Sequence, residues 1–428
     1  MALFAYVLLR KVQSMLENFG EARTVVLAGP GKRDLRLDLL RGIGQWMVLL
    51  DHIPNDFLNW FTIKNYGFSD ATEIFVFISG YSIGFAYGPA IKAGKFVAGA
   101  KRLWTRACQL YVAQIFLCLL LIAQVARTAA RFDNPMYKDE FNVAQFLDRP
   151  DIMIGQVLLL KYKPVDLDVL PLYIVLVLAA PAVLWGLLRR PNWTLVCSAV
   201  LYFAARHFDW NLPSFPGGKW YFNPFAWQFL FVFGIWCGLG GGPTVRTAAL
   251  SRPVTIVAAA WLVFAFLIVM TWHVPTLERF VPQALIHAMY PIDKTNLDPL
   301  RLTHFVALMV VLLRVLPPDL PGFTSKWLRA LILCGQRSLP VFCFGVLLSF
   351  AAHWILVQVA GGIVAQMLVS ALGIVLLVGI AWIATLYRGL PTLLGIETRV
   401  IRIGKDDPDD RGRVASGADG RSGSFASV

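Results

Sequence analysis

A stripe of polar side chains in the first long apolar run has the residue types needed for proton transfer. Arg41, Gln45, Val48 and His52 are spaced i, i+4, i+7 and i+11 in and around the run 43–50. This spacing places them on one face of a helix, with His52 about 16 Å beyond Arg41 along the axis. Polar residues at membrane depth are costly and therefore indicate function. A neutral imidazole in this position can remove a proton from an attacking hydroxyl group.

Structural interpretations of the same stripe are also open. His52 can be a hydrogen-bonded histidine inside a helix bundle, and Arg41 can be a juxtamembrane anchor paired with Asp38. Alternatively, the forked donors of Arg41 can hold phosphates or a thioester carbonyl. Asp51 is about 100° away around the helix, so we expect it to lie off the stripe.

The next apolar run adds a carboxylate and a hydroxyl. Glu73 opens this run, and Ser79 and Tyr81 lie farther along it. Glu73 can orient His52 or bind acceptor hydroxyls, or it can be a carboxylate snorkelling at a helix end. No G-x-S-x-G turn surrounds Ser79, so it is not expected to be a nucleophile and is interpreted as packing or donor contact.

Membrane-spanning helices must position these side chains. The 428 residues are 57% hydrophobic and 15% charged, and the mean hydropathy is +0.62. Soluble domains are less apolar and more charged, so we predict an all-α integral membrane protein, a bundle of about ten transmembrane helices. The approximate spans are 39–60, 70–91, 104–126, 167–188, 192–207, 224–240, 254–273, 300–316, 338–358 and 364–387.

Two further patterns concern packing and loops. Gly80, Gly84 and Gly88 recur at four-residue spacing, which predicts close packing against another helix. The loop 127–166 has no periodic segment of its own. The six cysteines form no C-x-x-C pair or metal-ligand spacing, so neither a metal site nor disulfides are expected.

Basic residues fix the expected orientation. The net charge of +13 comes from Lys and Arg before the first span and in every second loop, which the positive-inside rule explains without nucleic acid. Both termini are therefore expected in the cytoplasm and the loop 127–166 in the periplasm. The expected regions are a cytoplasmic or interfacial segment 1–36, a multi-span domain 37–390 and a cytoplasmic, largely disordered tail 391–428.

This orientation divides the polar residues into two groups. The residues expected to contact a donor are Arg41, Gln45, Ser79, Tyr81, Arg102 and Arg106. The residues expected to contact an acceptor are Asp166, Asp168, Trp227, Gln228, Arg301, His304 and His353. The aromatic cluster 220–228 is either a membrane-interface belt or, beside Asp166 and Asp168, a platform for sugar rings.

The opening motifs also resemble a known family. Arg41, ten residues and then His52, followed by Phe75-Val-Phe-Ile-Ser-Gly-Tyr81, is similar to the start of the membrane-bound acyltransferase-3 superfamily. Within it, the chain most resembles OpgC proteins, through Arg33-Asp-Leu-Arg-Leu-Asp38, Asp51-His-Ile-Pro54, Asn65-Tyr-Gly-Phe-Ser-Asp70 and matches as far as His353. The superfamily pattern assigns its essential histidine to His52, which favours a catalytic role.

The resemblance implies a succinyltransferase of osmoregulated periplasmic glucans in the bacterial inner membrane. We expect His52 and Glu73 to be catalytic, succinyl-CoA to be the donor substrate and no cofactor to be bound. Its partners are expected to be acyl-CoA, a periplasmic glucan and the bilayer. Three alternatives stay open: acetyl in place of succinyl transfer, transport of a glucan or lipid-linked sugar, and kinship with lysosomal heparan acetyltransferases, which share only the early histidine motif.

Overall fold

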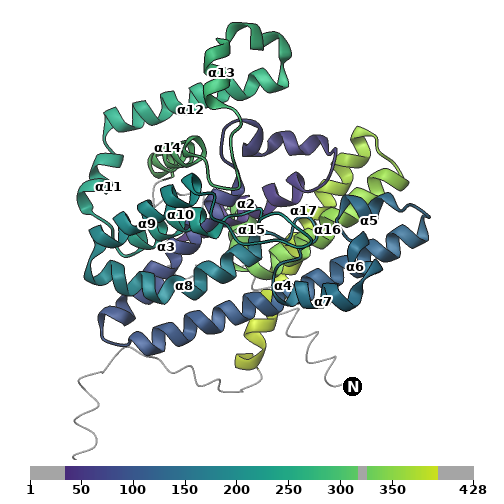
Figure 1. Cartoon of the computed structure of the whole chain (residues 1–428), viewed down its shortest axis with the longest axis horizontal. Helices are drawn as coiled ribbons and strands as arrows, with labels where there is room; N and C mark the ends of the chain where they lie inside the picture. The colour runs from purple at the N-terminus through teal and green to yellow at the C-terminus, as the bar shows by residue number, and fades with distance from the viewer. Residues whose placement is uncertain (1–33, 317–324, 394–428) are drawn as a thin grey trace, which may run out of the picture.

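Helices make up the regular structure of this chain. The computed structural model describes residues 34–316 and 325–393, and over these ranges it contains no strand beyond one isolated bridge between Pro213 and Lys219 (Figure 1). Within them, six helices are long and apolar enough to cross a membrane. These are α3 (Ala71–Lys92), α4 (Phe96–Arg131), α8 (Val169–Arg189), α12 (Arg252–His273), α16 (Ser338–Gln358) and α17 (Ile363–Leu393). The all-α membrane fold is confirmed.

The other four predicted spans contain shorter helices. They are α2 (Leu35–Asp51), α9 (Pro191–His207), α10 (Pro224–Gly238) and α14 (Pro299–Val315). Helices of 15 to 17 residues reach about 22–26 Å, less than the hydrocarbon thickness of about 30 Å. The total of ten crossings and the cytoplasmic location of the termini therefore stay predictions. Most of the segment 1–36 and of the tail 391–428 lies outside the described residues.

The first predicted span, 39–60, was wrong in its outer half. Helix α2 ends at Asp51 and His52 is its C-cap, with the backbone N–H of His52 bonded to the last carbonyls of the helix. Pro54 explains this end, because a proline disfavours helical geometry in the residue before it. Two short 3₁₀ turns, η1 (Phe57–Phe61) and η2 (Ile63–Asn65), then lead to α3.

The long loop 127–166 is also more ordered than we expected. Helix α4 continues to Arg131, and α5 (Met136–Glu140), α6 (Ala144–Asp148) and α7 (Pro150–Leu158) follow it (Figure 1). The prediction of no periodic segment was wrong, because helices of five residues are too short to show a clear apolar period. Each of these helices buries at least one large apolar side chain, and Tyr137 of α5 packs against Phe350 of α16.

Glycines bring the backbones of α3 and α10 into contact. A Cβ atom on Gly80 would lie 2.2 Å from the carbonyl oxygen of Phe231, and one on Gly84 would lie 2.3 Å from that of Ile235. Positions on both helices increase together, so the two helices run parallel. The predicted close packing of the α3 glycines is confirmed, with α10 as the partner.

Replacing Gly80 with alanine should therefore destabilise the protein. The added methyl group meets backbone atoms of α10, which cannot rotate away, so overpacking should cost about 1–3 kcal/mol of unfolding free energy. Gly155→Ala in α7 is the matched control, because no atom lies within 4 Å of its added Cβ. Thermal unfolding in detergent measures both variants. Equal melting temperatures for the two variants would contradict the packing argument.

A further helix supports α2. Helix α15 (Lys326–Gln336) was not among the predicted elements, and it packs against α2 through glycine on both sides. A Cβ on Gly42 would lie 1.8 Å from the carbonyl oxygen of Leu331, and one on Gly335 would lie 1.8 Å from that of Asp38. These backbone contacts fix the helix that ends at His52.

Candidate active site

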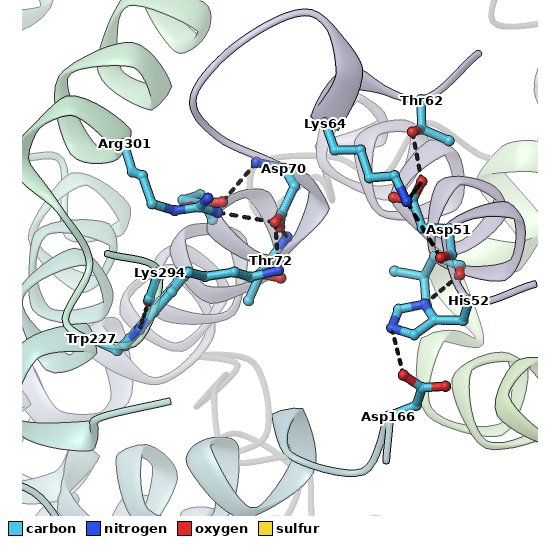
Figure 2. Close-up of polar contacts among 12 residues, drawn as sticks. Asp51, His52, Thr62, Lys64, Asp70, Thr72, Asp166, Trp227, Lys294 and Arg301 are labelled. Carbon is cyan, nitrogen blue, oxygen red and sulfur yellow. Dashed lines mark hydrogen bonds and ion pairs between the residues drawn. The ribbon is translucent and has the colours of Figure 1, made fainter. Parts of the chain in front are cut away.

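Several helix ends surround a cavity of about 460 Å³ next to His52. The C-terminal end of α2 and the N-terminal ends of α3 and α8 form much of the wall, and Lys64, Lys294, segment 221–222 and helix α16 complete it. Figure 2 shows some of these side chains, among them His52, Asp166 and Lys294. The polar and aromatic side chains in the wall are Asp51, His52, Lys64, Asp70, Thr72, Phe75, Asp166, Asp168, Tyr221, Phe222, Lys294 and Phe342. Segments far apart in the sequence thus meet at one place.

The imidazole of His52 is fixed by two contacts. Its Nδ1 atom lies 2.6 Å from the carbonyl oxygen of Val48, and its Nε2 atom lies 3.4 Å from Oδ1 of Asp166 (Figure 2). A carbonyl oxygen only accepts hydrogen bonds, so Nδ1 carries a proton and donates it to Val48. Nε2 is then the nitrogen that gains or loses a proton in the cavity.

Asp166 is the carboxylate closest to Nε2 of His52 among the ion pairs of the described residues. Its backbone has a φ of 70°, in the left-handed region that few non-glycine residues adopt. Burial raises the pKa of the Asp166 carboxyl, and the positive charges of His52, Lys294 and Lys64 oppose that shift. At 3.4 Å the contact is longer than a charge-assisted hydrogen bond, and it places a carboxylate beside the ring nitrogen that faces the cavity.

A second acid, Asp51, lines the same cavity as His52. We expected Asp51 to lie off the stripe of His52, and its contacts are indeed with other residues than those of His52. The Thr62 hydroxyl donates to Oδ1 of Asp51 at 2.6 Å, and Nζ of Lys64 lies 3.1 Å from the same oxygen. Asp51 is thus an ion-paired carboxylate at the wall.

Aromatic rings line the cavity together with the acids. Tyr221 and Phe222 are in the wall with Asp166 and Asp168, as the platform interpretation of the cluster 220–228 requires. Burial raises the pKa of Asp168 to about 6, although Lys163 at 3.7 Å acts against this shift. The use of these rings as a sugar platform stays a prediction.

A network of four charged groups lies at the start of α3, and two of them, Asp70 and Lys294, line the cavity. Nη2 of Arg301 lies 3.0 Å from Oδ2 of Asp70, and its Nε donates to Glu73 at 2.7 Å. Nζ of Lys294 lies 2.6 Å from the same oxygen of Asp70 (Figure 2). Burial alone would raise the pKa of Asp70, but the charges of Lys294 and Arg301 outweigh it and hold the pKa well below 3.8. The network links the start of α3 to α14.

Comparison with protein families gives one match. The sequence profile described as OpgC protein matches residues 33–389. The chain belongs to the OpgC family. Membership implies a membrane-bound acyltransferase that modifies glucans. Neither the search of curated proteins nor the search of solved structures found a match.

Glu73 in this OpgC-family protein lies outside the cavity wall. It is fully buried, and its carboxylate accepts from Arg301 and from the backbone N–H of Asp70, which completes a capping box at the start of α3. We expected Glu73 to orient His52 or to bind acceptor hydroxyls. In the structure, the contacts that orient His52 come from Val48 and Asp166 instead.

The expected acceptor residues divide into two sets in this family member. Asp166 and Asp168 line the cavity. The other five are bonded elsewhere. Trp227 Nε1 donates to the Lys294 and Thr295 carbonyls, Gln228 bonds Ser198, Arg301 bonds Asp70 and Glu73, His304 bonds Ser69, and His353 bonds Glu140. Trp227 and Arg301 reach the cavity only through Lys294 and Asp70.

The expected donor residues lie on α2, α3 and α4, and none of the six lines the cavity around His52. Arg41 donates to the Ser82 hydroxyl at 2.7 Å and to the Ile78 carbonyl at 3.2 Å. Its distance to Asp38 is 4.0 Å, so the anchoring contact is present as well. The remaining positions are as follows: Gln45 donates to the Ser338 carbonyl, Arg106 to Gln109, Ser79 and Tyr81 are partly buried, and Arg102 is exposed.

Sequence reasoning missed two lysines of the wall. Lys64 lies in the short turn η2 and Lys294 in a loop, and neither segment is long enough for periodicity to mark a face. The capping pattern Asp70-x-x-Glu73 was visible as a helix start. Nothing local in the sequence showed that Asp70 would meet Lys294 from a loop more than two hundred residues away.

Proposed function

We propose that this protein transfers a succinyl group from succinyl-CoA to a hydroxyl group of a periplasmic glucan, with His52 as the general base. The observation that carries the proposal is the fixed orientation of the His52 ring. The Val48 carbonyl holds Nδ1–H, which leaves Nε2 facing a cavity wide enough for an acyl group and a sugar hydroxyl. The acyltransferase chemistry of the OpgC family needs a base in such a position.

The reaction follows from these contacts. The acceptor hydroxyl binds Nε2 and its oxygen attacks the thioester carbonyl, while Nε2 takes the hydroxyl proton. The bond between the acyl carbon and sulfur then breaks, and the CoA thiolate leaves and receives that proton. Asp166 stabilises the imidazolium that forms in between.

The distance between His52 and Asp166 suits such an exchange of partners. Charge-assisted hydrogen bonds are usually about 2.7–2.9 Å long, and the pair is separated by 3.4 Å. A substrate hydroxyl can therefore become the nearest partner of Nε2 without breaking a strong bond. Direct transfer needs no acyl-enzyme, because a base next to the hydroxyl is sufficient.

The proposed topology brings the two substrates from opposite sides of the bacterial inner membrane. The donor would enter from the cytoplasm past Arg41, whose guanidinium can hold phosphate groups, and the glucan would enter from the periplasm. The distribution of basic residues supports this arrangement. Reporter fusions at Lys95 and Asp139 should label opposite compartments, with Lys95 in the cytoplasm. Labelling of both positions from one side would refute the topology.

A transfer assay tests the proposed function. Purified protein is incubated with radiolabelled succinyl-CoA and a neutral glucan, and label in the acidic glucan product is counted. We expect time-dependent transfer with succinyl-CoA. Transfer from acetyl-CoA alone would favour the alternative donor, and uptake of glucan into vesicles without acylation would favour a transporter. Label on the protein in the absence of acceptor would replace direct transfer with an acyl-histidine route.

A further inference from the structure

Lys294 is held at its backbone while its side chain reaches the wall of the cavity. The carbonyl oxygen of Lys294 accepts from Nε1 of Trp227 at 3.2 Å, and Trp227 is fully buried. The side chain of Lys294 is 30% exposed, and it lines the cavity next to His52 (Figure 2). A free lysine side chain samples many rotamers. Here the backbone contact and the ion pair with Asp70 limit the positions that the ammonium group can take.

The loop that carries Lys294 is itself fixed by buried amides. The backbone N–H of Asn223 donates to the Thr295 carbonyl at 3.0 Å, and its side-chain amide donates to Oδ1 of Asn296 at 2.7 Å. Asn296 in turn donates to Asp293 at 2.7 Å. Asn223 is also the N-cap of α10, so the loop is attached to a helix of the bundle. The ammonium position is therefore set by the core of the protein.

The ammonium group of Lys294 is held in position and still has N–H donors with which to bind a ligand. Asp70 takes one contact from it at 2.6 Å, and Arg301 holds Asp70 from the other side at 3.0 Å. An ammonium group has three N–H donors, and Asp70 is the ion-pair partner of Lys294 among the described residues. The rings of Tyr221 and Phe222 lie 5.9 Å and 5.7 Å from Nζ, so the ammonium is flanked by apolar surface.

The rest of the cavity repels anions. Three carboxylates, Asp51, Asp166 and Asp168, lie in the wall. Lys64, the other lysine there, is directed to Asp51, with Nζ 3.1 Å from its carboxylate and 3.4 Å from its backbone oxygen. An anionic group that enters beside His52 thus has Lys294 as its most favourable neighbour.

We infer that Lys294 binds the free carboxylate of the transferred acyl group and thereby selects dicarboxylic over monocarboxylic acyl donors. This inference rests on the proposed function and names the residue that selects which acyl group is transferred. A succinyl thioester has its reactive carbonyl and its carboxylate two methylene groups apart. One end would lie at His52 and the other at Lys294, across one cavity. An acetyl group would leave the ammonium without a ligand.

Donor preference of the full-length protein tests this role. We expect Lys294→Met to lower kcat/KM with succinyl-CoA about 10- to 100-fold, the usual value of a hydrogen bond to a charged group. The same change should alter kcat/KM with acetyl-CoA less than about threefold. Lys294→Arg, which keeps the charge, should retain part of the preference. Lys64→Met is the matched control in the same cavity and should leave the ratio of the two donors unchanged.

A measurement on the unaltered protein excludes a folding defect as the explanation. The monomethyl ester of succinyl-CoA has the same chain without the charge, and it should react about 10- to 100-fold more slowly than succinyl-CoA. Equal use of the ester, an equal loss with both donors in Lys294→Met, or a shifted ratio only in Lys64→Met would overturn the inference while leaving the acyltransferase intact. Wild-type protein that transfers neither acyl group would instead refute the proposed function.

Discussion

Replacing His52 with glutamine should lower the rate of acyl transfer about 10²–10⁴-fold while the protein still inserts and binds the donor. Glutamine keeps polarity and approximate size, and its amide can still donate to the Val48 carbonyl. It cannot accept and release a proton near neutral pH. The loss should therefore appear in kcat, with little change in KM for the donor. Steady-state transfer of label from succinyl-CoA to glucan measures it.

The control for this variant is a histidine outside the cavity. His287 lies exposed on α13 (Gln283–Met289), and His287→Gln should transfer label at the wild-type rate. His52→Gln that retains the wild-type rate would make His52 a structural residue. In that case the general base would have to be sought among the other titratable groups of the wall, Asp166 first.

Asp70→Asn should lower the unfolding free energy by about 3–5 kcal/mol at pH 7, the usual result of removing one partner from a buried ion pair. Asn at this position leaves Lys294 and Arg301 facing each other without the carboxylate that binds both. The fold lowers the pKa of Asp70, so its stabilisation is present above the unfolded value of 3.8 and is lost as the pH falls below it. The difference between variant and wild type should narrow in that acidic range.

Chemical or thermal unfolding in detergent micelles measures this effect. Asp151→Asn is the control, because Asp151 is an exposed carboxylate whose ion pair with Arg149 lies at the surface. It should unfold like wild type. If Asp70→Asn and Asp151→Asn unfold at the same denaturant concentration, the charged network contributes nothing measurable to stability.

Local sequence patterns predicted the helices better than their ends. The apolar runs gave the six long helices, and the glycine spacing gave the close face of α3. The end of α2 at Asp51 was missed although Pro54 signals it, because apolar residues resume at Phe57 and fill the length of a membrane span. Helices α5 to α7 and α15 are short. Packing against the bundle contributes more to their stability than intrinsic helix propensity does.

The site was predictable only where a reactive side chain lies in or next to an apolar run. His52 was conspicuous as a histidine in an apolar run, and Asp166 and Asp168 as acids at the entry to one, and these three do lie together. Lys64 and Lys294 lie in connections between the long helices, where charged residues are ordinary. Their convergence depends on contacts between distant segments, which no local spacing encodes.

The helix ends around the cavity also give it an electric direction. Helix α2 ends at His52, whereas α3 and α8 begin at the cavity with Asp70 and Asp168 as their N-caps. The aligned peptide dipoles of a helix place partial negative charge at its end and partial positive charge at its start. The end of α2 thus favours a positive charge at His52, whereas the starts of α3 and α8 offset part of the negative charge of Asp70 and Asp168. In the proposed reaction, the backbone would therefore stabilise the imidazolium that forms at His52.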